Sequence, residues 1–597
     1  MASPIEDYAL LGDAETAALV SKDGSVDWLA LPRFDSPACF AALLGDEGNG
    51  RWQIRPASPI RRTTRRYRAG LVLETEWTTD EGVVAVIDGM PMRDEQPNLI
   101  RIVEGRRGDV PMTFDLRVRF DYGSIVPWVR RVDGAWRAVA GPDAMCLYTP
   151  VTVRGRGFSS VAEFTVSEGD RVPFELRWHP SHHAPPPPLD PFRTMAATEK
   201  AWQEWVARCT YEGDWADAVR SSLVVLKGLT FSPTGGIVAA ATTSLPETMG
   251  GERNWDYRYC WLRDATFTLL ALLECGYTDE AGAWRDWLLR AVAGDPSELQ
   301  IMYGPRGERR LTELELPWLA GYGGSAPVRV GNSAHSQLQL DVWGEVMDAF
   351  WAGRQAGLPA DEDAWQLQRQ LLDHLETIWR QPDEGIWEVR GPRRDFTHSK
   401  VMAWVAFDRA VRTGERYGGP GPVAHWREQR DAIHAEVSAR GVDDRGVFVQ
   451  TFGGTELDAS LLLVPLVGFL PATDPRVVAT VDAIARELTD EGGFVRRYIP
   501  DPAVDGLAGR EGSFLLCTFW LADCYALQGR RDEAVALFER LLGLRNDVGL
   551  LSEQWDAGEK RMLGNFPQAF SHVALVDTAT NLDSSTPGAI DRRRQAL

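Results

Sequence analysis

The sequence predicts a multidomain fold in which an antiparallel β-sandwich precedes a closed ring of helical hairpins. Three observations support this fold class. The first 190 or so residues alternate apolar and polar side chains over short runs, a proline run follows them, and beyond it apolar residues recur at spacings of three and four. With 597 residues, the chain is also longer than one hydrophobic core usually serves, so we expect two domains.

The first elements in chain order are strands. Short runs rich in β-branched and aromatic residues are separated by Gly, Pro, Asp and Asn, with no helical period between them. Many short strands at this spacing are typical of an antiparallel sandwich, so we predict an N-terminal β-sandwich domain over residues 1–190. The clearest strand predictions cover residues 71–79, 82–88, 99–105, 112–120 and 171–178.

A proline-rich segment, APPPPLDP at residues 184–191, marks the strongest predicted domain boundary. Proline lacks a backbone N–H and fixes φ, so this run can continue neither a strand nor a helix. We predict a linker and a connecting helix over residues 191–212, followed by a helical domain over residues 213–597.

The remaining elements are helices joined by connections rich in Gly, Pro or Asp. About a dozen helices with few strands are typical of a closed ring of helical hairpins. The loops between them carry the unusual residue clusters, and residues 564–572, dense in aromatics and amides, are expected to form such a loop. The predicted helices cover residues 216–229, 266–275, 280–293, 336–356, 361–379, 400–413, 422–440, 457–467, 475–488, 513–528 and 530–542.

The composition excludes several classes of function. A net charge of −21 opposes binding to nucleic-acid phosphates, which requires clustered Lys and Arg. The start of the chain shows no signal segment and no apolar run is long enough to span a bilayer, so we expect a cytoplasmic protein without a membrane anchor. The seven Cys and nine His show no metal-ligand spacing, so we expect reduced cysteines, no metal and no cofactor.

The most informative segment is NWDYRYCWLRD at residues 254–264, which places two Trp and two Tyr among four charged side chains. A buried element avoids unpaired charge, and a solvated surface does not need so many rings. A carbohydrate site uses both, because rings cover the apolar face of a sugar while an Arg and a carboxylate bind its hydroxyls. We therefore interpret this segment as part of a sugar-binding site.

Two glutamates in separate predicted loops are candidate catalytic groups. Glu388 is flanked by Trp387 and Arg390, a candidate substrate-binding residue, and Glu553 lies near Trp555. Desolvation beside an indole raises the pKa of a carboxyl group, as a general acid requires, whereas a neighbouring Arg opposes that shift. Glycoside hydrolysis needs one carboxyl group to protonate the leaving oxygen and another to activate water or attack carbon. Further polar clusters that could line the same cleft are residues 243–247, 329–337 and 510–514.

These segments resemble glycoside hydrolase family 15, the group of glucoamylases, glucodextranases and bacterial trehalases. The resemblance covers essentially the whole chain, from IEDY at residues 5–8 and GSVDWL at 24–29 to NFPQ at 565–568. Its most specific parts are NWDYRYCWLRD, GIWE at 385–388 and SEQW at 552–555. The resemblance implies an N-terminal super-β-sandwich followed by an (α/α)6 barrel of helical hairpins, the catalytic domain, and inversion at the anomeric carbon.

The resemblance also implies roles for individual residues. Glu388 matches the general acid and Glu553 matches the general base. Arg263 and Asp264 match the pair that binds the 4- and 6-hydroxyls of the terminal glucose. The aromatic residues that match the same subsite are Tyr257, Trp261 and Trp387.

Two expectations concern the shape of this site. Adjacent side chains on a regular helix diverge by about 100°, so Arg263 and Asp264 must lie at a helix start or in a loop to bind neighbouring hydroxyls together. Fungal glucoamylases carry a second Glu directly after the acid, where this chain has Val389. We therefore expect a short leaving-group side and small substrates.

The main hypothesis is an inverting, exo-acting α-glucoside hydrolase that releases β-glucose from the non-reducing end of short α-glucosides, as glucoamylases do. An α,α-trehalase of the same family is the alternative, and it differs only in what fills the leaving-group side. A phosphorylase of similar architecture would leave Glu553 without a use. A sugar-binding protein without activity would not need both carboxyl groups. The expected partners are small α-linked glucosides.

Overall fold

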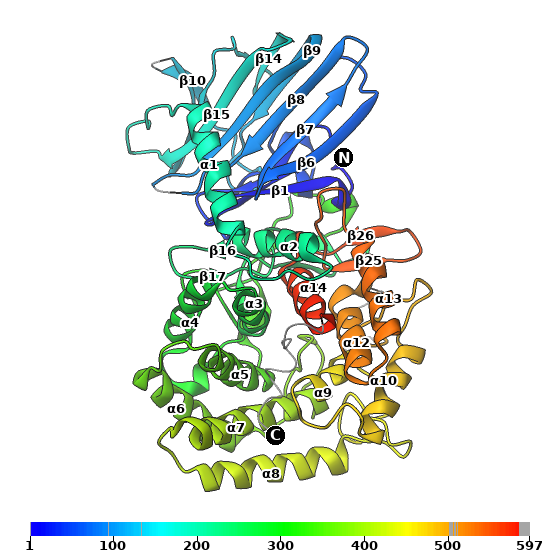
Figure 1. Ribbon diagram of the computed structural model, residues 1–597. Coiled ribbons are helices and arrows are strands. Elements are labelled where there is room, and N and C mark those ends of the chain that lie inside the picture. The colour runs from blue at the N-terminus through cyan, green and yellow to red at the C-terminus, as the bar shows by residue number, and fades with distance from the viewer. Residues whose placement is uncertain are drawn as a thin grey trace.

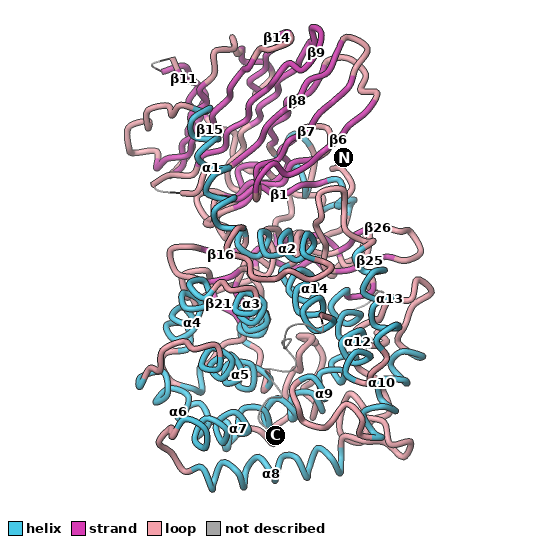
Figure 2. The backbone as a smooth tube through the Cα atoms, in the orientation of Figure 1, coloured by secondary structure: helices cyan, strands magenta, loops and turns pink. Residues whose placement is uncertain are grey.

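The structure is a computed structural model that describes residues 2–583, except residues 94, 133, 501–505, 507, 508 and 510 and the side chains of residues 265 and 266. It has two parts, a β-sandwich formed by the N-terminal residues and a ring of helices formed by the residues after it (Figure 1). Strands gather in the first part and helices in the second, with long loops between the helices (Figure 2). The predicted order of a β-sandwich followed by helical hairpins is confirmed.

The β-sandwich consists of two antiparallel layers. One layer has the order β1-β2-β3-β5-β9-β14-β13, with β4 paired to β3, and the other has the order β6-β7-β8-β9-β15-β12-β11-β10. The strands are β1 (Tyr8–Gly12), β2 (Ala17–Ser21), β3 (Ser25–Ala30), β4 (Ala38–Phe40), β5 (Arg51–Pro56), β6 (Arg62–Ala69), β7 (Val72–Thr78), β8 (Gly82–Gly89), β9 (Asn98–Arg117), β10 (Trp128–Val132), β11 (Ala135–Ala140), β12 (Asp143–Tyr148), β13 (Arg154–Arg156), β14 (Ser159–Ser167) and β15 (Arg171–Pro180).

Strand β9 belongs to both layers. Its first half pairs with β8 and β15, and its second half pairs with β5 and β14. Between the layers, Phe164 of β14 lies 5.6 Å from Phe174 of β15, and Phe114 of β9 stacks on Phe174 at 5.2 Å. Burial alternates along β5, as expected for a strand with one face in the core.

Helix α1 (Pro191–Val206) connects the two parts. It begins directly after the proline run, because the Asp190 carboxylate accepts hydrogen bonds from the backbone N–H groups of Phe192 and Arg193. Pro191 occupies the first helical position, where a missing N–H costs nothing. The proline run therefore ends in a helix cap, and α1 packs back against β6, β9 and β15.

The second part contains the remaining helices. None of the helices in the described part of the chain combines the length and the apolar character needed to cross a membrane. The helices are α2 (Ala216–Gly228), α3 (Leu262–Glu274), α4 (Thr278–Val292), α5 (Asp341–Gln355), α6 (Glu362–Ile378), α7 (Thr397–Tyr417), α8 (Val423–Arg440), the 3-10 helix η7 (Ala459–Leu462) continued by α9 (Leu463–Leu466), α10 (Pro475–Glu487), α12 (Leu515–Leu527), α13 (Arg531–Leu542) and α14 (Ala569–Leu582).

The helices form two concentric rings. In the inner ring α3 contacts α5, α5 contacts α7, α7 contacts η7 and α9, these contact α12, α12 contacts α14, and α14 contacts α3 again. The outer helices α2, α4, α6, α8, α10 and α13 each pack on an inner neighbour. The loops that lead into inner helices meet at one end of the barrel, and this end carries the pocket described below.

Most predicted helices are confirmed to within a few residues, but residues 564–572 are not entirely a loop. Helix α14 begins at Ala569, and the Gln568 side chain caps it by accepting a hydrogen bond from the N–H of Phe570 at 2.8 Å. As an inner helix, α14 is buried on nearly all sides. It therefore lacks the amphipathic period by which a helix is recognised in a sequence.

Candidate active site

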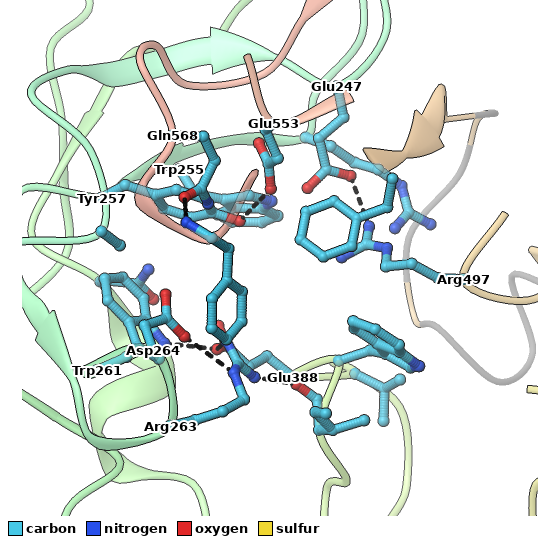
Figure 3. A pocket seen from close by; sticks show the side chains of 18 of the residues that line it. Glu247, Trp255, Tyr257, Trp261, Arg263, Asp264, Glu388, Arg497, Glu553 and Gln568 are labelled. Atoms are coloured by element: carbon cyan, nitrogen blue, oxygen red, sulfur yellow. Dashed lines mark hydrogen bonds and ion pairs between the residues drawn. The ribbon is translucent and has the colours of Figure 1, made fainter. Parts of the chain in front are cut away.

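A single pocket gathers all eight candidate site residues at the barrel end formed by the inner-helix loops (Figure 3). Its walls come from segments far apart in the chain, between residues 239 and 570. The candidates that line it are Tyr257, Trp261, Arg263, Asp264, Trp387, Glu388, Arg390 and Glu553. Their other neighbours in the wall are Ala239, Glu247, Arg253, Trp255, Asn332, Ile386, Val389, Arg497, Tyr498, Phe514, Gln568 and Phe570.

Arg263 and Asp264 lie in the first turn of α3, so the prediction that this pair occupies a helix start is confirmed. Arg263 Nε donates to Asp264 Oδ1 at 3.0 Å, and Arg263 Nη1 donates to the carbonyl oxygen of Ile386 at 2.5 Å. Burial raises the pKa of Asp264 to about 6, although Arg263 acts against that shift. The pair therefore presents a fixed donor and a fixed acceptor at one end of the pocket.

Glu388 lies in the loop between α6 and α7, on the opposite side of the pocket from Glu553 (Figure 3). Its Oε1 accepts a hydrogen bond from Trp261 Nε1 at 2.6 Å and lies 3.7 Å from Arg263 Nη2. Its backbone has φ of 59°, in the left-handed region that non-glycine residues rarely adopt. These constraints hold the carboxyl group in a defined position at the pocket wall.

Glu553 lies directly before strand β25 (Gln554–Asp556) and is 1% exposed. Its Oε1 accepts a hydrogen bond from the Tyr257 hydroxyl at 2.7 Å, and its Oε2 accepts from the backbone N–H of Asn565 at 3.3 Å. Burial and then the negative charge of Glu247 raise the pKa of Glu553 well above the ordinary value of a glutamate. Its ionised form is therefore a stronger base than an exposed carboxylate.

Aromatic rings connect the two carboxyl groups. The ring of Tyr257, which bonds Glu553, lies edge-on to the ring of Trp261, which bonds Glu388, with centroids 5.3 Å apart. Trp387 is held separately, because its Nε1 donates to Asp458 Oδ1 at 2.9 Å. Tyr257 and Trp261 thus hydrogen-bond the two carboxyl groups and also cover the pocket wall.

Arg390 lines the pocket but is already engaged by protein groups. Its Nη2 lies 3.1 Å from Glu313, its Nη1 donates to the Ser333 hydroxyl, and its guanidinium group lies over the Trp255 ring at 4.5 Å. Arg329 lies over the same ring at 4.6 Å. Arg390 therefore packs on the face of the Trp255 ring in the wall of the pocket.

The motif at residues 254–264 holds a second Arg–Asp pair that points away from the pocket. Arg258 and Asp256 are both fully buried, with Nη2 and Oδ2 2.7 Å apart. Arg258 also donates to the carbonyl oxygen of Ser36 at 2.9 Å and to the Tyr122 hydroxyl at 2.8 Å. Two of the four charged residues in the motif, Asp256 and Arg258, therefore lie where the helical ring contacts the β-sandwich.

Several charged or polar wall residues were not among the site predictions, and Glu247, Asn332 and Arg497 are three of them. Glu247 and Asn332 lie in clusters that we expected to line a cleft, but nothing in those clusters distinguishes the one side chain that faces inward. Arg497 carried no sequence signal, because it belongs to an ordinary RRY run. Arg510, from the third expected cluster, lies outside the described residues. In the part of the chain that the structure describes, no group of three or more His, Cys, Asp or Glu side chains could hold a metal ion.

Comparison with protein families assigns both parts of the chain. The model described as Glycosyl hydrolases family 15 matches residues 213–580, and the model described as Trehalase-like, N-terminal matches residues 1–202. In fold, the chain is similar to the crystal structure of a bacterial glucoamylase complexed with acarbose, with a TM-score of 0.70 and 12% identity over 100% of this chain and 97% of that one. The similarity shows that the two folds agree.

Several curated proteins are similar over nearly the full length. Trehalase from Mycobacterium tuberculosis is 40% identical over 97% of this chain and 89% of its own length. Trehalase from Thermoplasma acidophilum is 34% identical over 95% of this chain and 98% of its own length. Isomaltose glucohydrolase from Kribbella flavida is 28% identical, but over only 41% of this chain and 62% of its own length.

Proposed function

The chain belongs to family 15 of the glycosyl hydrolases, and on this premise we propose that it hydrolyses α,α-trehalose to two molecules of glucose with inversion at the anomeric carbon. The observation that carries the choice of substrate is the relationship to six proteins named trehalase, each aligned with at least 95% of this chain. Of the two enzymes that the sequence suggests, these relatives favour the trehalase over the broader α-glucosidase.

We assign the general acid to Glu388. Trp261 and Arg263 hold its carboxyl group at the pocket wall, and its proton passes to the oxygen that joins the two glucose rings. The bond between this oxygen and the anomeric carbon then breaks, and the second glucose leaves with the proton. Arg263 and Asp264 bind the hydroxyls of the ring that is attacked, which fixes its anomeric carbon between the two carboxyl groups.

We assign the general base to Glu553. The hydrogen bonds from Tyr257 and Asn565 orient its carboxylate, and the carboxylate takes a proton from the water that attacks the anomeric carbon. Inversion requires room for this water, so we expect the carboxyl groups of Glu388 and Glu553 to lie about 6.5–9.5 Å apart with substrate bound. A retaining enzyme would place them at about 5 Å.

Substrate and stereochemistry can be tested together. The test compares kcat/KM for trehalose, maltose, isomaltose, kojibiose and maltotriose. We expect the value for trehalose to exceed each of the others by at least about 100-fold, a difference in transition-state stabilisation of about 2.7 kcal/mol. Proton NMR during trehalose cleavage should show α- and β-glucose formed first in equal amounts, because only the attacked ring is inverted. Faster cleavage of maltose would contradict the proposed substrate, and initial release of α-glucose alone would contradict inversion.

The roles of the two glutamates can be separated with an activated substrate. Glu553→Gln should abolish hydrolysis of both trehalose and α-glucosyl fluoride, because both need an activated water. Glu388→Gln should abolish trehalose cleavage but spare α-glucosyl fluoride, since fluoride leaves with little protonation. Equal losses on both substrates for both variants would contradict this division of roles.

A further inference from the structure

A second ion pair lines the pocket across from Arg263 and Asp264. The Nη2 atom of Arg497 lies 3.0 Å from Glu247 Oε2, and both residues lie in the pocket wall. In Figure 3 this pair occupies the side opposite Asp264, with Glu388 and Glu553 between the two pairs. The pocket therefore has an arginine–carboxylate pair at each end and the proposed catalytic groups in its middle.

The backbone around Glu247 is fixed by three other segments. The N–H of Glu247 donates to the carbonyl oxygen of Arg253 at 3.2 Å, and its carbonyl oxygen accepts from Gly512 at 3.2 Å. Pro246, one residue earlier, accepts from the N–H of Gly564 at 2.8 Å. A Cβ atom on Gly564 would lie 2.2 Å from Glu553 Oε2, so Gly564 connects the segment that holds Glu247 to the proposed base.

The side chain of Glu247 is 2% exposed and belongs to a cluster of four charged groups. Arg497 donates from Nε to Glu511 at 3.3 Å and also bonds Glu511 through Nη2, while Arg253 Nη1 lies 3.9 Å from Glu511. Two carboxylates and two guanidinium groups balance one another, which offsets part of the cost of their burial. A carboxylate has about four acceptor positions, so the pair with Arg497 leaves capacity for substrate hydroxyls.

We propose that Glu247, positioned by Arg497, binds the hydroxyls of the second glucose ring, the one that leaves. This inference rests on the proposed function. The two rings of α,α-trehalose are chemically identical and carry the same hydroxyls on either side of the bond that breaks. A pocket with one arginine–carboxylate pair at each end matches such a substrate, because each pair offers a guanidinium donor and a carboxylate acceptor to one ring. The neighbour of the acid, Val389, offers no such group.

Glu247 has a competing role that the same geometry allows. Its negative charge raises the pKa of Glu553, so its removal could change the rate through the base alone. The two roles differ in their dependence on the leaving group. α-Glucosyl fluoride has no second ring, so a contact to that ring cannot affect it, whereas a change in the base affects every substrate.

The test compares Glu247→Gln with the wild type on trehalose and on α-glucosyl fluoride, each at the pH optimum of that variant. We expect kcat/KM for trehalose to fall by about 100-fold or more, because a site built to bind hydroxyls is left with a weaker acceptor, and kcat/KM for the fluoride to change by less than about threefold. Glu247→Asp keeps the charge but withdraws it by one methylene group. It should also lose activity on trehalose while its activity on the fluoride stays nearly unchanged.

Glu280→Gln is the matched control, because Glu280 is also a buried carboxylate that pairs with arginine, Arg208, but it lies outside the pocket. It should affect both substrates equally. Equal losses on trehalose and fluoride for Glu247→Gln, or no loss on trehalose, would overturn the proposal. If the wild type instead prefers maltose, the proposed function fails, while the ratio of disaccharide to fluoride still decides whether Glu247 binds the leaving ring.

Discussion

Glu388 and Glu553 face one pocket from different surroundings. Glu388 lies beside the cation of Arg263, whereas Glu553 is buried near the anion of Glu247. A nearby negative charge and burial strengthen a base, and the hydroxyl of Tyr257 limits the effect by stabilising the carboxylate. The balance of these effects sets the pH range in which Glu553 is ionised.

Tyr257→Phe tests this balance. The substitution removes the hydrogen bond to the ionised form of Glu553, so the pKa of Glu553 should rise further. Because the base must be ionised to act, activity is lost as pH falls through this pKa. The acidic limb of the kcat/KM profile should therefore move to higher pH in the variant. A limb that stays in place or moves to lower pH would contradict the assignment of Glu553 as the base.

The sequence predicted these residues better than it predicted their partners. The motifs contain all eight candidates, and all eight line the pocket, but their roles stay predictions. The motif at 254–264 contains two Arg–Asp pairs of similar appearance, and only the fold shows that Arg263 faces the pocket while Arg258 faces the β-sandwich. Glu247 and Arg497 come from separate loops, and no local pattern records that these loops meet.

At the scale of elements, the pocket depends on the close packing of the inner helices. Gly344 of α5 faces α7, where a Cβ atom would lie 2.3 Å from the backbone oxygen of Met402. Gly282 of α4, an outer helix, has no atom within 4 Å of the position that a Cβ would take. The same residue type therefore serves packing in the inner ring and only weakens the helix in the outer ring.

The pair of substitutions Gly344→Ala and Gly282→Ala tests this difference. Gly344→Ala should lower the melting temperature, because overpacking at a helix contact costs about 1–3 kcal/mol. Gly282→Ala should raise it slightly, since alanine favours a helix over glycine by about 0.5–1 kcal/mol. Thermal unfolding followed by circular dichroism measures both. A Gly344→Ala protein as stable as the wild type would show that α5 and α7 can move apart without cost.

Most helices could be predicted, including the almost fully enclosed α12, but the sequence did not predict α14. Helix α6 carries a clear apolar stripe and agrees with its predicted bounds to within one residue at each end. Helix α14 is surrounded by neighbours, so its apolar residues have no period and its first turn looked like a loop. Helix α3 starts before its apolar period does, because its first turn carries Arg263 and Asp264.

At the scale of the whole molecule, the β-sandwich contacts the segments that form the walls of the pocket, through residues 241 and 258. Arg258 of the motif donates to the backbone of Ser36 and to Tyr122, and Trp28 Nε1 donates to the carbonyl oxygen of Ala241 at 2.8 Å. These contacts join residues more than 100 positions apart, which no local sequence pattern could reveal. We propose that residues 1–190 and 213–597 form two domains that act as one unit.

Arg258→Ala tests the dependence of the pocket on this contact. It leaves the Asp256 carboxylate buried without its cation, which typically costs about 3–5 kcal/mol. We expect a lower melting temperature together with a lower kcat on trehalose, although Arg258 does not line the pocket. Arg61→Ala, which breaks an exposed pair with Asp80 in the β-sandwich, should change neither quantity. Unchanged stability and kcat in Arg258→Ala would show that this contact is dispensable for the site.

The left-handed backbone of Glu388 has an evolutionary consequence. A residue with a side chain costs about 1–3 kcal/mol in this conformation, and glycine or asparagine tolerates it better. Selection for folding alone would therefore replace this glutamate, and its proposed role as proton donor would retain it. In a lineage that no longer needs the reaction, loss of the proposed proton donor carries no penalty. Replacements that relax the backbone at position 388 are then favoured, so this position should be among the first to change.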